Sequence, residues 1–413
     1  MAASQWDALL HGQADENPFM RHAYLAALHE SGAASPKTGW TPRFITLWRG
    51  EEMVAACALY LKAHSHGEYV FDHAWANAYH QHGLSYYPKA LVAVPFTPVP
   101  GARLLARTQA DREALVQGLV AWCGQEKLSS LHLLFANEED VAACATHGLM
   151  LRHTVQFHWT NVAPTPVDAR TALRSAGADF LGDGPVFFKS GDANNDLLPD
   201  SLFRSFDDFL ASLSQEKRKK IRQERRKVAD AGVTFRSSMG ARIALADWDF
   251  FYRCYERTYL EHGNAPYLSR NFFQRMADTM PDNWLLFIAE RDGTPIAASL
   301  IAISSPNATN LIAYGRYWGA LERVDCLHFE ACYYQPLQWC IEHGFLRFEG
   351  GAQGEHKMAR ALMPVKTSST HWLAQPAFAD AVERFLAREG EGIENYMTDL
   401  SQRSPFRNPV QQA

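Results

Sequence analysis

Residues 284–304 read WLLFIAER-DG-TPIAASLIAIS, two apolar runs on either side of Asp292-Gly293. An Asp-Gly pair between apolar runs is a strong short-range signal for a tight turn, so this stretch predicts a β-hairpin of long, half-buried strands. Residues 43–61 repeat the pattern, with RFITLWR, a Gly50-Glu51 turn and MVAACALYL. The sequence therefore contains two copies of one predicted hairpin.

The segments that follow the two hairpins also correspond. An aromatic and histidine-rich stretch, a predicted helix at about 111–127 and a predicted strand, LHLLF, at 131–135 follow the first hairpin. An aromatic stretch from Tyr314 to Trp318, a predicted helix at about 327–343 and a predicted strand, LRFEG, at 346–350 follow the second. The same elements in the same order indicate two copies of one α/β unit.

The chain has 413 residues, which exceeds what one hydrophobic core usually supports, so two domains are expected. We place an N-terminal domain at 1–160 and a C-terminal domain at 205–413. Residues 161–204 form the predicted linker or insertion between them, because 164–200 are rich in Pro, Gly, Ala and Asp without a sustained period. A strand, VTFRSS, and an amphipathic helix at 247–263 are also expected in the second domain.

The C-terminal domain is expected to open with one basic helix at 205–231. Ser205 and Asp208 have the spacing of a capping box, and Gly232 is a natural stop. The whole chain carries 40 basic and 45 acidic residues, a net charge of −5. Between Glu216 and Lys227, however, eight cations stand against two glutamates, a local charge of +6: Lys217, Arg218, Lys219, Lys220, Arg222, Arg225, Arg226 and Lys227.

The basic helix has three interpretations. Its cations could grip the phosphates of tRNA or another RNA, they could lie on an anionic membrane surface, or they could form a solvated face whose long stems cover apolar surface. The overall negative charge excludes a protein that coats nucleic acid generally.

The composition favours a reduced, cytoplasmic protein. The seven cysteines are an odd number without a CxxC pair, and most lie in apolar runs where a free thiol behaves as a small hydrophobe. No window approaches the roughly 18 apolar residues of a membrane helix. The N-terminal stretch lacks the basic start and apolar run of a secretory signal.

Four long motifs carry a family resemblance: the aromatic stretch 69–105, KRKKIRQERRKV, LHFEACYYQ (327–335) and FEGGAQGEHKMARALMP (348–364). Together and in this order they resemble the Fem-like predicted N-acyltransferases of "peptidoglycan biosynthesis/recognition", within the GNAT superfamily. The resemblance covers residues 1 to about 407. One departure is the 164–200 segment, which separates QFHW (156–159) from SFDDFL (205–210).

The resemblance implies a tandem pair of GNAT-like folds, each a mixed central sheet flanked by helices. It also implies acyl or aminoacyl transfer to an amine acceptor, such as a cell-wall precursor or a small metabolite. The donor would be an acyl-CoA or an aminoacyl-tRNA, and no metal is expected. Such a transfer needs a base for the amine, donors for the oxyanion and an acid for the leaving group.

The predicted helix at 327–343 places candidate acid and base groups near its start. His328 and Glu330 lie in the first turn, and Glu330 shares a face with Tyr333 or Tyr334, three and four residues later. A carboxylate or imidazole would then serve as base, and a phenol as the acid for the leaving group. The alternative is that Glu330 only complements the helix dipole while the tyrosines pack.

The segment FEGGAQGEHKMAR is a second candidate site. Glu349 ends an apolar strand, where α/β enzymes concentrate polar chemistry, and it is a candidate base, as is Glu355. Gly350, Gly351 and Gly354 would let the backbone approach a ligand, and Gln353, His356 and Lys357 would contact it, with His356 also a candidate for acid/base work. The alternative is a flexible glycine turn with solvated charges.

A partial phosphate-loop pattern precedes the helix. The superfamily binds the CoA pyrophosphate on backbone amides at a helix N-terminus, usually signalled by Q/R-x-x-G-x-G/A. Arg316 and Gly319 satisfy the first two positions and Leu321 fails the third. We expect Arg316 and Gly319 to contact donor phosphates; the alternative is an ordinary connection from strand to helix.

The aromatic stretch of the first copy predicts one wall of an acceptor pocket, with rings for stacking and cations for an anionic group. The expected contacts are His73, Trp75, Asn77, Tyr86, Tyr87, Lys89 and Arg103, together with Tyr314 and Trp318 of the second copy. His73, His80 and His82 do not supply a tetrahedral zinc framework, so no metal site is predicted.

The sequence thus predicts a cytoplasmic N-acyltransferase with its donor site in the C-terminal copy. Two alternatives from other classes remain open. One is a GNAT-fold recognition module without catalysis, and the other is an RNA-binding protein that works through the basic helix.

Overall fold

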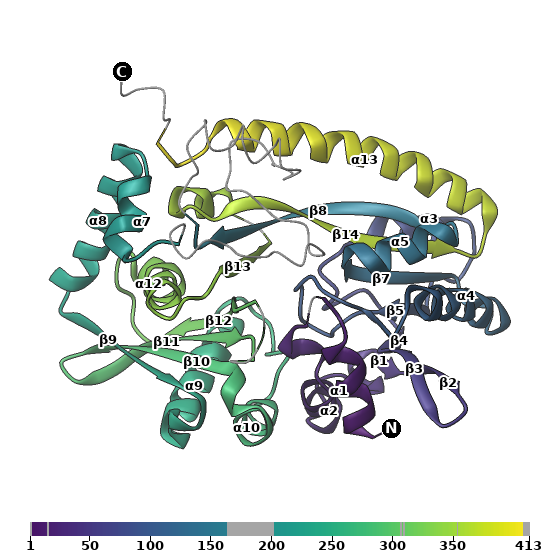
Figure 1. Ribbon diagram of the computed structural model, residues 1–413, viewed down its shortest axis with the longest axis horizontal. Coiled ribbons are helices and arrows are strands. Elements are labelled where there is room, and N and C mark those ends of the chain that lie inside the picture. The colour runs from purple at the N-terminus through teal and green to yellow at the C-terminus, as the bar shows by residue number, and fades with distance from the viewer. Residues whose placement is uncertain are drawn as a thin grey trace. The chain divides into compact units, whose positions relative to one another are not determined.

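The computed structural model describes residues 2–14, 16–162, 202–305, 308, 310–352 and 354–407 (Figure 1). The chain forms two compact units. Unit 1 comprises Met1–Val155, Tyr267–Met280 and Lys366–Asn395; unit 2 comprises Gln156–Pro266, Pro281–Val365 and Tyr396–Ala413. Two segments that the sequence assigned to the C-terminal domain, 267–280 and 366–395, thus belong to unit 1. Most of the predicted linker, 163–201, lies outside the described residues.

Unit 1 holds the elements of the first copy and two later additions. Its helices are α1 (Ala3–His11), α2 (His22–Glu30), α3 (His73–Gln81), α4 (Gln109–Gln125), α5 (Glu138–Thr146), α10 (Arg270–Thr279) and most of α13 (Pro376–Gln402). Its strands are β1 (Trp40–Pro42), β2 (Ile45–Arg49), β3 (Glu52–Cys57), β4 (Leu59–Lys62), β5 (Lys89–Val92), β6 (Leu104–Ala106), β7 (Ser130–Ala136), and parts of β8 (Met150–Thr160) and β14 (Met363–Leu373).

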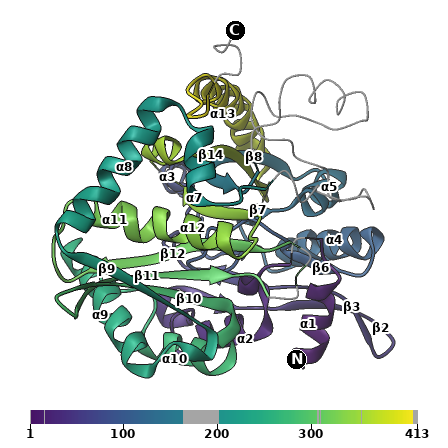
Figure 2. The same cartoon turned by 60° about the vertical axis from the view of Figure 1, so that its left-hand side comes forward.

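Unit 2 holds the elements of the second copy. Its helices are α7 (Phe206–Ser212), α8 (Gln215–Asp230), α9 (Leu245–Glu261), α11 (Leu327–Phe329), a π-helical turn (Glu330–Tyr334) and α12 (Gln335–Glu342). Its strands are the end of β8, β9 (Val233–Met239), β10 (Trp284–Arg291), β11 (Thr294–Ile303), β12 (Ile312–Ala320) and β13 (Arg347–Ala352). Figure 2 shows α9 on one face of strands β9–β12, and α11 and α12 on the other.

The two units repeat one strand order. In unit 1, β4 and β5 are antiparallel, β5 and β7 are parallel, and β7 and β14 are antiparallel. In unit 2, β11, β12, β13 and β8 follow the same order with the same directions. A helix connects the parallel strands in both units, as parallel pairing requires. The predicted repeat of one α/β unit is confirmed by this topology.

The last strand of each set is exchanged between the two copies. β8 follows β7 in the chain, yet its residues 156–160 pair with β13 in unit 2. β14 follows β13, yet its residues 368–373 pair with β7 in unit 1. Consecutive halves of the sequence therefore do not coincide with the compact units.

The two hairpins differ in their surroundings. β10 and β11 pair within the mixed sheet of unit 2, flanked by β9. The first hairpin, β2 and β3, pairs with β6 in a separate three-stranded sheet. The expected single strand at 53–61 is wrong, because the chain leaves that sheet at Ala58 and continues as β4 in the mixed sheet.

The single basic helix predicted at 205–231 is also wrong. Ser205 caps the first part as expected, since its hydroxyl accepts a bond from the Asp208 amide at 3.1 Å. The helix then breaks after Ser212. Leu213 is extended and bridges Phe406, and the Ser214 amide donates to the Pro405 carbonyl at 2.9 Å. Pairing with the C-terminal segment thus divides the region into α7 and α8.

Among the described residues, none of the helices combines the length and the apolar composition needed to cross a bilayer.

Candidate functional site

A pocket of about 150 Å³ lies in unit 2 beside the parallel strands β12 and β13. These strands pair where Ile312–Tyr314 lie opposite Arg347–Glu349. The pocket lies against Phe348 of this pairing and against the parts of both strands that continue beyond it. Its wall comes from β11, β12, β13, α11 and the turn that follows α11. The lining residues are Ser299, Ile301, Gly315, Arg316, Tyr317, Trp318, His328, Cys332, Tyr333, Phe348 and Gly350.

The helical segment beside the pocket is irregular. α11 starts after Cys326, which has a left-handed backbone with φ 65°, and one π-helical turn over Glu330–Tyr334 joins it to α12. His328 and Cys332 lie four residues apart and share a face. The wider π turn also brings Tyr333 into the pocket wall. Turns of this kind occur often at functional sites.

His328 and Tyr333 lie next to each other at the pocket. Their ring centroids are 5.7 Å apart with the planes nearly perpendicular, and Trp318 lies 5.5 Å from His328. Surrounding protein atoms lower the pKa of His328, and His356 and Arg360 lower it further. Burial raises the pKa of Tyr333. At neutral pH the imidazole is therefore uncharged and the phenol keeps its proton. The same surroundings make His328 a weaker base and Tyr333 a weaker acid than the free side chains.

Arg316 lines the pocket, as expected for a donor contact. The predicted loop between a strand and a helix is wrong. Arg316 and Gly319 lie within β12, not in a connection from strand to helix. The absence of a side chain at Gly319 has a packing reason. A Cβ there would lie 2.0 Å from the Cys254 carbonyl oxygen of α9. This glycine lets α9 approach β12 closely.

Glu349, the leading candidate base, does not line the pocket. Its neighbours Phe348 and Gly350 do, and successive side chains of a strand point to opposite faces. Glu349 is buried on the other face, where its Oε1 lies 2.9 Å from Arg347 Nη2 and its Oε2 lies 4.0 Å from His158 Nε2. The structure therefore argues against Glu349 as the base of this site.

Glu330 and Tyr334 also point away from the pocket. Glu330 is buried and accepts hydrogen bonds from Arg225 Nε at 3.1 Å and Gln335 Nε2 at 2.8 Å. Tyr334 donates to Glu224 of α8, whose Oε2 also accepts from Arg360 Nη2 at 2.7 Å. These bonds fasten the π turn to α8, which favours the structural alternative for both residues.

Lys357 fixes the glycine turn. It is 6% exposed, and its Nζ donates to the carbonyls of Gly350 at 2.6 Å, Gly351 at 3.3 Å and Ala352 at 2.9 Å. Burial lowers the pKa of Lys357 to about 8. Because this ammonium already donates to three carbonyls, it is not available to bind a donor phosphate. The predicted contact between Lys357 and a donor phosphate is therefore not supported.

The neighbouring residues Gly351, Gly354, Glu355 and His356 are not among those that line the pocket. Gly351 and Gly354 have φ of 72° and 92°, which L-residues rarely adopt. His356 is exposed, with its ring 5.9 Å from that of Phe329. Glu355 pairs with Arg403 at 3.1 Å. Gln353 lies outside the described residues.

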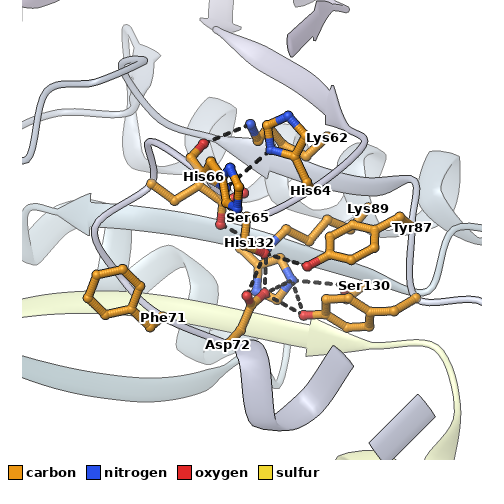
Figure 3. A network of polar contacts seen from close by, with 12 residues as sticks. Lys62, His64, Ser65, His66, Phe71, Asp72, Tyr87, Lys89, Ser130 and His132 are labelled. Atoms are coloured by element: carbon orange, nitrogen blue, oxygen red, sulfur yellow. Dashed lines mark hydrogen bonds and ion pairs between the residues drawn. The ribbon is translucent and has the colours of Figure 1, made fainter. Parts of the chain in front are cut away.

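A buried polar network occupies unit 1 at the parallel strands β5 and β7 (Figure 3). Lys89 is fully buried and donates to Glu68 Oε2 at 2.8 Å, to Ser65 Oγ at 2.8 Å and to Asp72. Asp72 also accepts from Tyr86 at 2.6 Å and from Ser65. The network, which we call the Lys89 cluster, comprises Ser65, Glu68, Asp72, Tyr86, Tyr87, Lys89, Ser130 and His132.

The two carboxylates of the Lys89 cluster, Glu68 and Asp72, have pKa values shifted in opposite directions. Burial acts to lower the pKa of Lys89, but the carboxylates of Glu68 and Asp72 outweigh it and raise the value. Burial raises the pKa of Glu68 to about 7. Burial also acts to raise that of Asp72, but Lys89 and His132 hold it well below its usual range. The cluster thus holds a charged Asp72–Lys89 pair, with Glu68 sharing the cation.

A family model for peptidoglycan biosynthesis/recognition, FemAB-like, matches residues 1–169 and 197–408. The chain belongs to the FemAB-like family. A comparison with curated protein sequences returned no match.

Solved structures share the fold of this FemAB-like protein at low sequence identity. A crystal structure of FemX matches with a TM-score of 0.51 and 10% identity, over 93% of this chain and 98% of that one. The C-terminal DUF2156 domain of a putative lysylphosphatidylglycerol synthetase from Agrobacterium fabrum matches with a TM-score of 0.50 and 11% identity, over 93% and 96%. With the repeated strand order, these matches confirm the predicted fold class, a tandem pair of GNAT-like units with mixed sheets flanked by helices.

The predicted acceptor wall of this FemAB-like protein does not form one open surface. Lys89 and Tyr86 belong to the buried cluster, and Tyr87 bonds Ser65 at 2.8 Å. Arg103 is 1% exposed and donates to backbone carbonyls, among them Leu134 at 2.9 Å. These contacts argue against the predicted binding of an anionic group by Lys89 or Arg103.

The other predicted substrate contacts are divided between core and surface. Trp75 is buried against His132, with ring centroids 6.0 Å apart, and Tyr314 is buried within β12. His73 and Asn77 are exposed on α3. Of the predicted substrate residues, Trp318 alone lines the pocket of unit 2.

Most cations of the basic region are solvated. Lys219, Lys220, Arg222, Arg226 and Lys227 are exposed on α8, and Lys217 and Arg218 are partly exposed. Arg225 differs, because its guanidinium bonds the buried Glu330. Arg225 thus attaches α8 to the π turn, and the other cations of α8 form a face that is partly or fully exposed to solvent.

Sequence reasoning missed pocket residues that carry no obvious chemistry. Ser299 and Ile301 belong to the apolar strand β11, and Cys332 looked like a small core residue. In unit 1 it missed Glu68 and His132. His132 had one available signal, as a polar residue within the apolar run LHLLF.

Proposed function

We propose that this FemAB-like protein transfers an acyl group from an activated ester or thioester donor to an amine. The pocket of unit 2 receives the acyl group. The observation that carries the proposal is the position of His328 and Tyr333 in the wall of this pocket, with ring centroids 5.7 Å apart. Burial lowers the pKa of the imidazole and raises the pKa of the phenol. Family membership supports the same reaction class.

The amine nitrogen attacks the donor carbonyl and forms a C–N bond, and His328 accepts the proton that the nitrogen loses. The bond from the carbonyl carbon to the leaving sulfur or oxygen then breaks. Tyr333 donates a proton to the leaving group and is reprotonated from His328 or solvent, so an amide and a free thiol or hydroxyl result. General acid–base assistance of this kind contributes about 10²–10⁴-fold to a rate.

Arg316 supports the donor. It lies in the pocket wall with its guanidinium 5.2 Å from the Tyr317 ring centroid. A cation at this position stabilises negative charge on the donor or on the tetrahedral intermediate.

The test is donor turnover by two single variants. Release of thiol or free tRNA is followed with acetyl-CoA, longer acyl-CoAs and charged tRNA in the presence of a set of amines. With the donor that is used, we expect His328→Gln and Tyr333→Phe each to lower kcat about 10²–10⁴-fold. His262→Gln, an exposed histidine at the end of α9, is the matched control and is expected to keep its rate.

The pH profile gives a second readout. A base must be unprotonated, so the rate falls as pH drops through the pKa of His328, which lies below the ordinary 6.5. This acid limb should disappear in His328→Gln. Full activity of both variants would overturn the catalytic assignment. Donor binding without turnover in the wild-type protein would instead favour a recognition module.

A further inference from the structure

The pairing of His328 with Tyr333 depends on the π turn. The two residues are five positions apart, and in a regular α-helix of about 3.6 residues per turn such side chains point about 140° away from each other. In the π turn over Glu330–Tyr334, the Gln335 amide instead bonds the Glu330 carbonyl, five residues back. The two rings then lie 5.7 Å apart in the pocket wall. A return to regular helix would separate them.

Arg360 packs against this turn from outside the pocket. It is 2% exposed, and its guanidinium carbon lies 3.6 Å from the centroid of the Phe329 ring. The rings of Tyr334 and Tyr333 lie 5.8 and 6.0 Å from the same carbon. Phe329 directly follows His328 in the chain, so Arg360 contacts the neighbours of both paired rings. Arg360 is not among the residues that line the pocket, and it therefore acts on the pocket through these neighbours.

Hydrogen bonds fix the Arg360 guanidinium in two directions. Its Nη1 donates to the His356 carbonyl at 2.8 Å, and its Nη2 donates to Glu224 Oε2 of α8 at 2.7 Å. The same carboxylate oxygen accepts the Tyr334 hydroxyl of the π turn. Glu224 is buried, so its charge is tolerated because Arg360 lies beside it. Arg360 thus ties the π turn to α8.

We propose that Arg360 is a positioning residue for the transfer reaction, which holds the π turn so that Tyr333 stays beside His328. This inference rests on the proposed function, which gives the two rings their roles. A lysine would carry the same charge, but it lacks the planar fork that bonds Glu224 and the His356 carbonyl together. The role therefore requires the shape of the guanidinium as well as its charge.

The kinetic test uses Arg360→Met and Arg360→Lys with the donor and amine that the wild-type protein turns over. We expect both variants to lower kcat and kcat/KM together, by about 10²-fold for Arg360→Met, because a small displacement of a catalytic group has an effect of this size. Arg236→Met is the matched control. Arg236 belongs to the same unit and bonds Asp247 and Glu290, none of which lines the pocket, so this variant should keep its kcat.

A double variant separates positioning from a general loss of stability. If Arg360 acts through Tyr333, then Arg360→Met should lower kcat less than about 3-fold in a Tyr333→Phe background. Equal factors in both backgrounds would overturn the inference. Tyr334→Phe removes one bond between the π turn and Glu224 and leaves the carboxylate paired with Arg360. It should lower kcat in the same direction, also where Arg360→Met folds poorly.

A crystal structure of Arg360→Met gives a readout that needs no turnover. We expect the Gln335 amide to leave the Glu330 carbonyl, and the ring centroids of His328 and Tyr333 to move apart by about 1 Å or more. An unchanged π turn with the centroids still 5.7 Å apart would overturn the inference. Full activity of His328→Gln and Tyr333→Phe, with the turn altered in Arg360→Met, would instead overturn the proposed function.

Discussion

The parallel strands β5–β7 of unit 1 and β12–β13 of unit 2 occupy the same place in a repeated fold, yet they differ in what lies beside them. In unit 1 the place holds the buried Lys89 cluster, with Lys89 fully enclosed. In unit 2 it holds an open pocket with His328, Tyr333 and Arg316. One topology therefore encloses a polar network in one copy and leaves a pocket in the other, and we propose that the first serves stability and the second serves binding.

The largest expected effect concerns the Lys89 cluster. Lys89→Met leaves Asp72 and Glu68 buried without their cation, which typically costs about 3–5 kcal/mol. Urea unfolding should show a loss of this size. Lys37→Met, at an exposed lysine of unit 1, is expected to change the free energy of unfolding by less than about 0.5 kcal/mol. A loss below about 1 kcal/mol for Lys89→Met would contradict a structural role.

The next effect concerns Gly319 in unit 2. Gly319→Ala places a Cβ 2.0 Å from the Cys254 carbonyl oxygen, so α9 must shift, and overpacking of this kind costs about 1–3 kcal/mol. Thermal unfolding measures it. Gly390→Ala in α13 is the control, because its Cβ meets nothing within 4 Å and a helical alanine is favourable. If Gly319→Ala keeps its stability but loses donor binding, the phosphate role is restored.

A smaller effect should appear in the pH dependence of stability. The pKa of Glu68 is raised to about 7 in the folded protein, so the folded state holds this proton more tightly than the unfolded state does. The resulting contribution to the free energy of unfolding is fully present below pH 4.5 and is lost as pH rises through 7. Glu68→Gln removes this dependence. We therefore expect the variant to gain stability relative to wild type between pH 5 and 8, on the order of 1 kcal/mol. Urea unfolding at four pH values tests this, and parallel curves would contradict it.

The smallest effect is expected on the exposed face of α8. Reversing Lys219, Lys220, Arg226 and Lys227 to Glu should change the free energy of unfolding by less than about 1 kcal/mol, because these cations are solvated. Donor binding should persist with an acyl-CoA. Loss of turnover with charged tRNA alone would support the RNA interpretation. Arg225→Ala, on the same helix, should cost more because it faces the buried Glu330.

Several elements of the fold could be predicted because their signals are local. The hairpin at Asp292-Gly293, the cap at Ser205 and the repeat of helix and strand all follow from short patterns. Arg316, Trp318, His328, Tyr333 and Gly350 were also named from sequence, and the structure brings them to one pocket. The motifs that carried the resemblance contain three of them, His328, Tyr333 and Gly350.

The remaining features depend on contacts distant in sequence. The break of the basic helix at Leu213 needs the partner segment at Phe406, and the burial of Glu330 needs Arg225 from α8. The face of β13 on which Glu349 lies follows from its pairing with β8. None of these partners is visible in the local pattern.

By itself, the sequence determined that the chain has two related α/β units, and it predicted that the chemistry gathers in the second. Local turn, cap and periodicity signals suffice for this because they act between residues a few positions apart. The tertiary structure decided which groups share a pocket, which charges are consumed by ion pairs, and which strand each copy gives to the other. Those outcomes depend on burial and pairing between distant segments, because a carboxylate such as Glu349 or Glu330 is a base or a structural anchor according to the cation that lies beside it.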